Sequence, residues 1–547
     1  MGRRRWVLGV AIALAAASVA VGSGGEALAA GASAASAGAG VGSKEALAQD
    51  NCDAKTGRIK FQFYGAAPCV RPWTDTDDNG GATAQGVTAK AIKVVVLIPP
   101  ADKDRASTNG GIKNQATNAN GLSKDAVLDE NAVLAHSYQT WGRTIEYEFL
   151  EASGTDETAA RADAVNVIAK KPFAVLDTAL YANGGGGLVF EQAVKAAGVP
   201  VYPNAVSPTD LLKPYEVNMA EWVGKELVGG KAQFGGDTVK DKKRVFGVIY
   251  QGGSNGMDLS VFTKAFAKYG GKIAPGAAVS YTSPTDTAAQ SAAYQEQAPP
   301  LIAKLKQAGV TTIVNFAGAG LTANATGSFT KQATSQDWFP EWLVSGVPYN
   351  DLDFFARSLD QAQWEHAFGE VWFTPFVAGG ASDAITALFQ WYWGKTQGTH
   401  SPGIFSNVYT LYNGVMTAGP KLTPKSFNAA LAKFPSSGGA FQGMITNLET
   451  GIAPAPIPLR GTALAWWDPK ATGGSNQIGI PGTGKYAYLN GGKRYLTGKY
   501  PDKLQPFFDA SKSTLQFDTV PPQDVIGPYP CDNCPSTGGS QTPASAS

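Results

Sequence analysis

The stretch from Phe173 to Ser207 constrains the fold of this chain more than any other. It opens with a short apolar run, Phe173–Leu176, which is typical of a buried parallel strand. A polar loop with four successive glycines follows, and then an apolar stripe at helical spacing across residues 188–197. Gly198 ends that helix, and residues 199–202 form a second apolar run. This order of strand, loop, helix and strand predicts one unit of a parallel α/β sheet.

Ligands of open α/β sheets bind just beyond the carboxyl ends of the strands. In this stretch those positions are residues 177–181 and 204–207. We therefore expect functional residues in these two segments.

The same alternation of strand and helix is predicted both before and after this stretch. Further apolar strands are predicted at Ile92–Ile98, Thr144–Leu150, Arg244–Tyr250, Val310–Phe316 and Trp342–Ser345. Amphipathic helices are predicted between them, including one that is capped by Asp156 and one that is opened by Pro300. The chain therefore predicts two similar α/β halves, each a doubly wound parallel sheet with helices on both faces.

The last third of the chain is less regular. Helices are predicted at residues 384–393 and 427–434, and the sequence beyond Trp467 is rich in glycine and proline. The pair Asn490-Gly491 lies between two short apolar runs, which predicts a β-hairpin there.

Composition and charge exclude several classes of function. The chain has 547 residues and a net charge of +1, and no basic run follows the first few residues. A nucleic acid or an anionic membrane surface would have no electrostatic attraction to such a chain, so we expect neither as a partner. The length is sufficient for two domains with ample cores.

The N-terminus has the features of an export signal. Arg3–Arg5 are followed by an apolar stretch and by small residues around Ala29, which predicts a signal peptide over residues 1–29. A membrane anchor and a twin-arginine signal are the alternatives. No cysteine near the cleavage site offers a lipid attachment point. We expect an exported protein of the periplasm, cell envelope or extracellular space, with residues 30–50 disordered.

The four cysteines lie near the two ends of the chain. Export favours two local disulfides, Cys52–Cys69 and Cys531–Cys534, although four cysteines allow three pairings. A zinc site is the alternative, and it would require the two ends of the chain to meet. The histidines show no metal-ligand spacing, so no metal is predicted.

Two glycine-rich motifs could indicate an enzyme. Residues 252–256 fit G-x-S-x-G, which would make Ser254 the nucleophile of a secreted serine hydrolase. No acid and histidine follow in a recognisable pattern, so a glycine-rich ligand loop is favoured. Residues 318–323 fit a dinucleotide-binding loop, but a tight strand-to-helix turn is favoured in an exported chain. We expect no catalytic residues and no cofactor.

Four segments in order, together with the export signal, suggest a known family. IKVVVLIPP, AGVPVYPNAVS, KRVFGVIYQGGSNG and KQAGVTTIVNF resemble type I periplasmic solute-binding proteins, in the leucine/isoleucine/valine-binding branch of ABC transporter receptors. The resemblance covers residues 88 to 470. It implies two α/β lobes joined by three crossing segments, with a ligand held between the lobes.

The resemblance also implies ligand-binding residues. From the first lobe these are Thr178, Ala179, Tyr181, Ala205 and Ser207, and from the second they are Tyr250, Gln251, Asn255, Phe316, Ala317, Gly318 and Asp351. The chain departs from the family pattern at Asn255, where an aromatic residue is usual, and at Val347, where an acid would hold an α-ammonium group. The expected ligand is therefore amino-acid-like or another small organic or carboxylate solute.

The expected domain organisation follows from the same resemblance. Lobe I comprises residues 88–213 and 376–442, and lobe II comprises residues 214–375 and 443–470. A cysteine-bearing lead-in precedes them, and a Gly/Pro-rich extension, residues 471–547, follows. The function expected is that of a monomeric, non-enzymatic receptor that delivers a small molecule to a membrane ABC permease. A receptor for a membrane sensor and a hydrolase using Ser254 are the alternatives.

Overall fold

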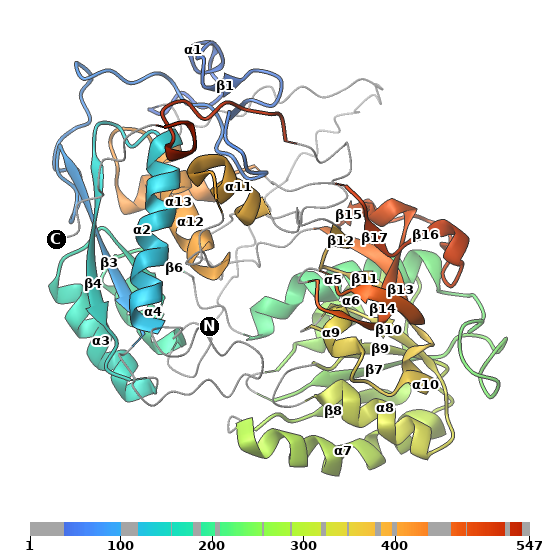
Figure 1. The fold of residues 1–547 in the computed structure, drawn as a ribbon. Coiled ribbons are helices and arrows are strands. Elements are labelled where there is room, and N and C mark those ends of the chain that lie inside the picture. The colour runs from blue at the N-terminus through green and yellow to red at the C-terminus, as the bar shows by residue number, and fades with distance from the viewer. Residues whose placement is uncertain are drawn as a thin grey trace, which may run out of the picture.

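Two large β-sheets, each covered by helices, form the framework of the chain (Figure 1). The computed structural model describes residues 38–99, 119–154, 156–178, 187–202, 208–253, 256–284, 287–318, 324–346, 349–377, 384–395, 402–435, 461–476, 479–519 and 526–538. We call each sheet, with the helices that pack on it, a lobe. The predicted α/β class with two helix-covered sheets is confirmed; the sheet of lobe I is wholly parallel, whereas that of lobe II adds antiparallel strands to its parallel ones.

The sheet of lobe I has four parallel strands. Its order is β4 (Thr144–Glu151), β3 (Ala91–Ile98), β5 (Ala174–Asp177) and β6 (Val201–Tyr202). Five successive residues of β3, Val94–Ile98, are buried, because helices cover both faces of the sheet. One face packs on α3 (Glu157–Ala169) and α4 (Gly187–Ala196), and the other on α2 (Ala119–Ser137), α11 (Ala384–Trp393), α12 (Pro402–Ala418) and α13 (Pro424–Leu431).

The sheet of lobe II is larger and mixed. Five parallel strands run in the order β8 (Ile273–Tyr281), β7 (Phe246–Gln251), β9 (Thr312–Phe316), β10 (Glu341–Val344) and β11 (Ala367–Val371). The helices α5 (Pro208–Glu226) and α6 (Leu259–Ala267) cover one face, and α7 (Thr287–Gln307), α8 (Ala325–Ser335) and α10 (Gln361–Trp364) cover the other. The short helix α9 (Asp353–Ala356) follows β10.

The end of the predicted lobe II and the region expected as a Gly/Pro-rich extension, residues 471–547, together supply antiparallel strands to lobe II. β13 (Gly461–Gly474) pairs with β11, and β14 (Pro481–Leu489) and β16 (Ser513–Thr514) continue the sheet. Two further short strands, β12 (Phe376–Val377) and β17 (Gln516–Phe517), pair in parallel beside it.

The predicted hairpin at Asn490-Gly491 is wrong. β15 (Arg494–Leu496) pairs with residues 461–463 of β13, while β14 pairs with residues 465–474 of the same strand. The chain turns through three residues of positive φ, Asn490, Gly491 and Gly492, and continues along the same edge of β13. The turn residues were recognised correctly, but the two strands lie end to end because β13 is long enough to pair with both.

The helix predicted to open at Pro300 begins earlier. α7 runs from Thr287 to Gln307, with Pro299 and Pro300 inside it. Each proline removes one backbone hydrogen bond. Apolar residues on both sides of the prolines, Tyr294, Ala298, Ile302 and Leu305, are buried against the sheet, and this packing holds the helix together.

Both ends of the described chain pack on lobe I. The N-terminal lead-in contains α1 (Lys44–Leu47) and the paired strands β1 (Cys52–Asp53) and β2 (Arg58–Ile59), and a disulfide joins Cys52 to Cys69. The C-terminal segment, residues 526–538, ends in η5 (Pro535–Thr537) and contains the disulfide Cys531–Cys534. The two segments meet where the Tyr529 hydroxyl donates to Asp53 Oδ2 at 2.8 Å.

The chain passes between the lobes four times. It leaves lobe I after β6 for α5, returns between β12 and α11, leaves again between α13 and β13, and returns between β17 and the C-terminal segment. The resemblance implied three passages, and the C-terminal segment adds the fourth.

Lobe II encloses charged groups. Arg244 and Glu341 form a bidentate ion pair, with Nε to Oε2 at 2.8 Å and Nη2 to Oε1 at 2.9 Å, and their side chains are 1% and 0% exposed. A second buried pair joins Lys485 and Asp353 at 3.8 Å. Among the described residues, no helix is long and apolar enough to cross a membrane.

Candidate functional site

The carboxyl ends of four parallel strands form one edge of the lobe II sheet. Because β11, β10, β9 and β7 are neighbours in that order, the segments that follow them lie side by side. These segments contain most of the second-lobe residues that the resemblance implied as ligand contacts. The site is therefore built along this edge.

The segment after β10 is anchored by hydrogen bonds on both sides. The Asn350 amide donates to the carbonyl of Ala317, which follows β9. Tyr486 of β14 donates its hydroxyl to the Asn350 carbonyl at 2.5 Å, and Asn476 donates to the Asp351 carbonyl at 2.7 Å. The backbone of this segment is thereby fixed between the parallel and antiparallel halves of the sheet.

The Asp351 carboxylate links this segment to the one after β11. Its Oδ2 accepts from the backbone N–H of Trp372 at 2.5 Å and of Phe373 at 3.3 Å. Its Oδ1 is buried and has no hydrogen-bond partner among the described residues. Burial raises the pKa of Asp351 to about 7, although the two N–H donors act in the opposite direction.

A second buried carboxylate, Glu370 of β11, lies close by. Its Oε2 accepts from Thr462 at 3.1 Å and from Tyr500 at 3.3 Å, while its Oε1 has no partner within the described part of the chain. Burial raises the pKa of Glu370 well above its ordinary value, and the charge of Asp351 adds to this effect.

Aromatic rings cover the same edge. Tyr215 of α5 packs on Trp372 with ring centroids 4.4 Å apart. Gly346, at φ +73°, leaves the space that the Trp372 ring fills, since a Cβ there would lie 1.9 Å from Trp372 Cδ1. Tyr349 is half exposed and stacks near Phe373 at 6.4 Å. The indole N–H of Trp372 is buried and has no acceptor among the described residues.

This edge therefore brings together three buried polar atoms that lack partners in the described protein. Buried polar groups are almost always hydrogen-bonded, and each exception requires an explanation such as a water or a ligand. Asp351 Oδ1 and Glu370 Oε1 can accept hydrogen bonds, and Trp372 Nε1 can donate one. An edge with aromatic faces and unpaired buried polar atoms can bind a small organic molecule.

The corresponding edge of lobe I presents Thr178 directly after β5. Its side chain is 5% exposed, and its hydroxyl donates to the carbonyl of Leu97 at 2.8 Å. At the end of β6, the Tyr202 hydroxyl donates to Asn428 Oδ1 at 3.4 Å. These contacts are internal to lobe I, and the Thr178 hydroxyl oxygen remains able to accept a hydrogen bond.

The other implied ligand residues of lobe II differ in exposure. Tyr250 and Gln251 are half-buried at the end of β7. Phe316 is 2% exposed and packs edge-on against Phe262, and Ala317 is fully buried. The Gly318 N–H donates to the Tyr281 hydroxyl at 3.3 Å. The implied residues Ala179, Tyr181, Ala205, Ser207 and Asn255, and the nucleophile candidate Ser254, lie outside the described residues.

Sequence reasoning did not single out Tyr215, Glu370 or Trp372. Glu370 lies in β11, and Trp372 directly follows it. The sequence of β11, AFGEV, contains a glycine and a glutamate and therefore does not read as an apolar strand. Tyr215 follows a proline within α5. All five residues of β11 are buried, but burial is a property of the folded chain and is not visible in the sequence.

The carboxyl edges of the two sheets lie near each other. Five residues, 203–207, connect Tyr202 at the end of β6 to Pro208 at the start of α5, and a link of this length reaches at most about 20 Å. Tyr215, on the same helix, touches Trp372 at the lobe II edge. The next passage between the lobes also leaves from this edge, after β12.

Comparison with known proteins gives structural likeness only. No family model matches the chain, and no curated protein matches it. Among solved structures, it is similar to a Rhodopseudomonas palustris ABC transporter solute-binding protein in complex with 4-hydroxybenzoate, at 14% identity and a TM-score of 0.43, covering 76% of this chain and 98% of that one.

Two further solved structures are similar to the same extent. One is a leucine-, isoleucine-, valine-, threonine- and alanine-binding protein from Brucella ovis, at 12% identity and a TM-score of 0.43, covering 76% of this chain and 98% of that one. The other is a fatty acid ABC transporter substrate-binding protein from Thermomonospora curvata, at 15% identity and a TM-score of 0.42, with the same coverage. By description, two of the three are solute- or substrate-binding proteins of ABC transporters, and the third is an amino-acid-binding protein.

Proposed function

We propose that this protein is an exported, non-enzymatic receptor that binds a small organic solute between its two lobes and delivers it to a membrane ABC permease. The observation that carries the proposal is the edge of lobe II, where Asp351, Glu370 and Trp372 each bury a polar atom without a protein partner. A ligand that also touches lobe I would supply those partners.

Four passages of chain between the lobes are consistent with motion about a hinge. Lobes joined by a few segments move relative to each other by default. A ligand that contacts both edges binds the closed arrangement better than the open one, and so shifts the population toward closure. Thr178 and Ser207 are the residues that we expect to contribute from lobe I, and Tyr349 and Trp372 those from lobe II.

The chemistry of the lobe II edge favours a ligand with an apolar or flat body and hydrogen-bonding groups. Tyr215, Tyr349 and Trp372 offer aromatic area. Asp351, whose pKa is about 7, can accept from a ligand donor when ionised and can donate to a ligand oxygen when protonated. Amino-acid-like and other small carboxylate solutes both fit this description.

Export and delivery to a permease rest on the N-terminal sequence and on the family resemblance. The signal-like residues lie outside the described part of the chain. A receptor of this kind acts as a monomer, and its role requires no cofactor and no nucleic acid.

Native mass spectrometry of protein purified without denaturation tests the proposal most directly. We expect a retained small molecule, together with a smaller radius of gyration by X-ray scattering when the molecule is present. Calorimetry with that molecule should show affinity about tenfold weaker for Trp372→Phe, since this change removes one hydrogen-bond donor.

Trp338→Phe is the matched control. Trp338 is a similarly buried tryptophan of lobe II, but it precedes β10 and so lies toward the opposite edge of the sheet. Equal affinities for both variants, with an unchanged radius of gyration, would show that this edge is not the binding site. Labelling of Ser254 by a fluorophosphonate, lost in Ser254→Ala, would favour the hydrolase instead.

A further inference from the structure

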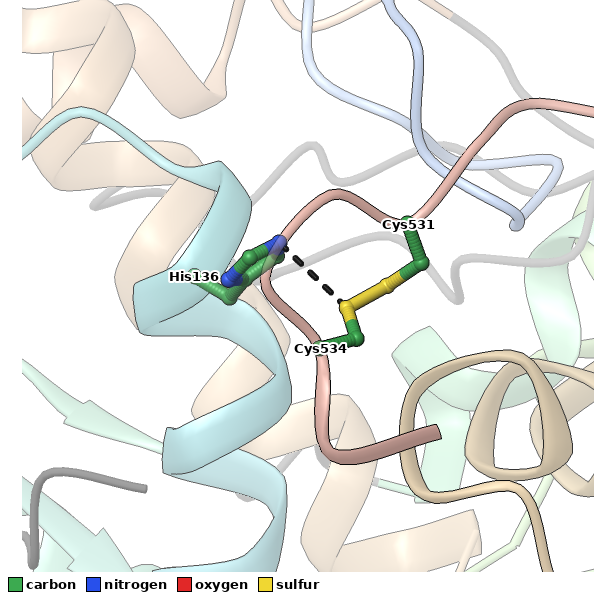
Figure 2. A group of neighbouring side chains, drawn as sticks. All are labelled: His136, Cys531 and Cys534. Atoms are coloured by element: carbon green, nitrogen blue, oxygen red, sulfur yellow. Dashed lines mark hydrogen bonds between the residues drawn. A yellow bond between two sulfur atoms is a disulfide. The ribbon is translucent and has the colours of Figure 1, made fainter. Parts of the chain in front are cut away.

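A second cluster of chemically reactive side chains lies on lobe I, where the C-terminal segment docks. Figure 2 shows His136, from the last turn of α2, beside the bridged pair Cys531 and Cys534. We call these three residues the tail cluster. One nitrogen and two sulfur atoms of the cluster all lie within 4.8 Å of one another.

The distance between the histidine and one of the two bridged cysteines matches that between two ligands of one metal ion. Zinc binds thiolate sulfur at about 2.3 Å and imidazole nitrogen at about 2.0–2.1 Å in tetrahedral geometry, which places a sulfur and a nitrogen ligand about 3.5 Å apart. In the tail cluster, His136 Nε2 lies 3.4 Å from Cys534 Sγ. Two cysteines separated by two residues are also a common zinc-binding pair.

The donors are held in place by the surrounding structure. The ring of His136 packs on Tyr392 with centroids 5.4 Å apart. Trp391, on the same helix, donates its indole N–H to the Tyr529 carbonyl at 2.8 Å and accepts at its own carbonyl from Ser536 Oγ at 2.8 Å. The C-terminal segment is therefore hydrogen-bonded to α11 on both sides of the two cysteines, and α11 also supplies Tyr392, on which the His136 ring packs.

Burial and exposure leave an entry path to the cluster. Cys531 is 7% exposed and Cys534 is fully buried, whereas His136 is exposed. Asp532, between the cysteines, is exposed as well. A cation could reach the sulfur atoms from the solvent side of His136, and a water or the Asp532 carboxylate could take the fourth position.

The disulfide itself constrains little of the chain. It joins residues only three apart in sequence, and in the chain-entropy account the stabilisation by a disulfide falls as the closed loop becomes shorter. The segment is already held by Tyr529, Ser536 and the buried cysteine side chains. Because the bridge adds little to the stability of this segment, the two cysteines can serve a second role in addition to forming the disulfide.

We propose that the reduced tail cluster is a binding site for one thiophilic divalent cation such as Zn²⁺, with Cys531, Cys534 and His136 as protein ligands. An external dithiol first reduces the bridge by thiol–disulfide exchange, so that two electrons and two protons pass to the cysteines and the dithiol becomes a disulfide. Cation binding then displaces both thiol protons and leaves two thiolates and a neutral imidazole on the metal.

The site is therefore conditional on redox state. While the bridge is intact, both sulfur atoms are committed to each other and cannot act as thiolate ligands. Reduction creates the site without moving the backbone far, because the histidine already lies at ligand distance from one sulfur. Occupancy of the site would report whether the C-terminal segment has been oxidised.

Cobalt titration of the full chain tests this proposal. The background is Cys52→Ser/Cys69→Ser, which removes the other disulfide, so that only Cys531 and Cys534 can supply thiolates. After reduction by a dithiol and its removal under anaerobic conditions, we expect one Co²⁺ per chain, with thiolate-to-cobalt charge-transfer absorption. The same chain with its bridge intact should show no such absorption.

Histidine variants provide the decisive comparison. His136→Ala should weaken Co²⁺ and Zn²⁺ binding at least about tenfold, since second-shell losses alone cost tenfold or more. His366→Ala, which removes an imidazole in lobe II, should leave binding unchanged. His136 is exposed, so the variant should keep its fold, as circular dichroism would show. Absence of charge-transfer absorption in the reduced chain, or equal affinity in His136→Ala, would overturn the proposal.

Discussion

The two lobes reach stability in different ways. Lobe I has a small, all-parallel sheet with apolar faces, and both disulfides lie in segments that cover it from outside. Lobe II has a larger, mixed sheet with charged pairs in its interior. Arg244 lies just before the parallel strand β7, Glu341 lies at the start of the parallel strand β10, and Lys485 lies on the antiparallel strand β14. The ion pairs of lobe I that involve Glu148, by contrast, lie at the surface. The same α/β architecture can thus be held by covalent links at its periphery or by charge pairs within it.

Breaking the buried ion pair of lobe II should have the largest effect. Glu341→Ala leaves the Arg244 guanidinium buried without its partner, which costs about 3–5 kcal/mol of unfolding free energy. The variant also removes the acceptor for Thr312 Oγ1 at 2.6 Å. Glu148→Ala in lobe I breaks an ion pair at the surface and should cost only about 0–1 kcal/mol of unfolding free energy. Urea unfolding followed separately for each lobe measures both.

A double variant sharpens this prediction. Arg244→Met/Glu341→Leu replaces both charges by apolar groups, and such exchanges are often neutral or stabilising. We therefore expect it to recover most of the stability lost in Glu341→Ala. A Glu341→Ala variant no less stable than Glu148→Ala would show that the interior of lobe II does not depend on this pair.

Removing the peripheral link of lobe I should have the next largest effect. Cys52→Ser/Cys69→Ser opens a loop between residues 17 apart, and a loop of about this length contributes about 3 kcal/mol in the chain-entropy account. The loss should appear in the unfolding of lobe I and leave lobe II unchanged. Calorimetry that resolves the two lobes would check this, and a loss shared equally by both lobes would contradict the comparison.

The pH dependence of stability should differ between the lobes by a smaller amount. The pKa of Asp351 is raised to about 7 in the folded protein, so the folded state binds more protons than the unfolded state between about pH 4 and pH 7. This carboxyl therefore stabilises lobe II on acidification and loses that contribution as the pH rises through 7.

The matched variant isolates this effect. Lobe II of the natural chain should gain about 1 kcal/mol per pH unit, relative to Asp351→Asn, as the pH falls from 7 to 5. Thermal unfolding across this range measures the difference. Parallel pH profiles for the two proteins would show that Asp351 titrates normally in the folded state.

How much the sequence predicts also differs between the lobes. Continuous apolar runs correctly predicted β3, β5, β7 and β9, because strands covered on both faces have no polar alternation. β8 was not predicted because its Pro275 and Gly276 are typical of a turn, and only pairing with β7 makes it extended. Of β14, only the end was predicted, as one strand of the hairpin, because the start of the strand is rich in glycine. Local patterns predict the continuously apolar parallel strands, whereas the parallel strands β8 and β11 and the antiparallel strands depend on tertiary contacts.

The same limit applies to the candidate site. Asp351 was found because its loop follows a recognisable strand, β10. Trp372 and Tyr215 lie far apart in the sequence and meet only when α5 packs beside β11. The stacking of Tyr215 on Trp372 and the unpaired indole N–H of Trp372 arise only in the folded protein, so no residue spacing in the sequence could have indicated them.

The docking of both chain ends on lobe I has a consequence for the order of folding. A chain that emerges from its N-terminus completes the residues of lobe II, up to β17, before the C-terminal segment that covers lobe I. The face of lobe I formed by α2 and α11 therefore keeps apolar area exposed until the last residues of the chain have been made. The lobe that begins first is therefore the one that is completed last, and a chain truncated before Cys531 would leave that face of lobe I uncovered.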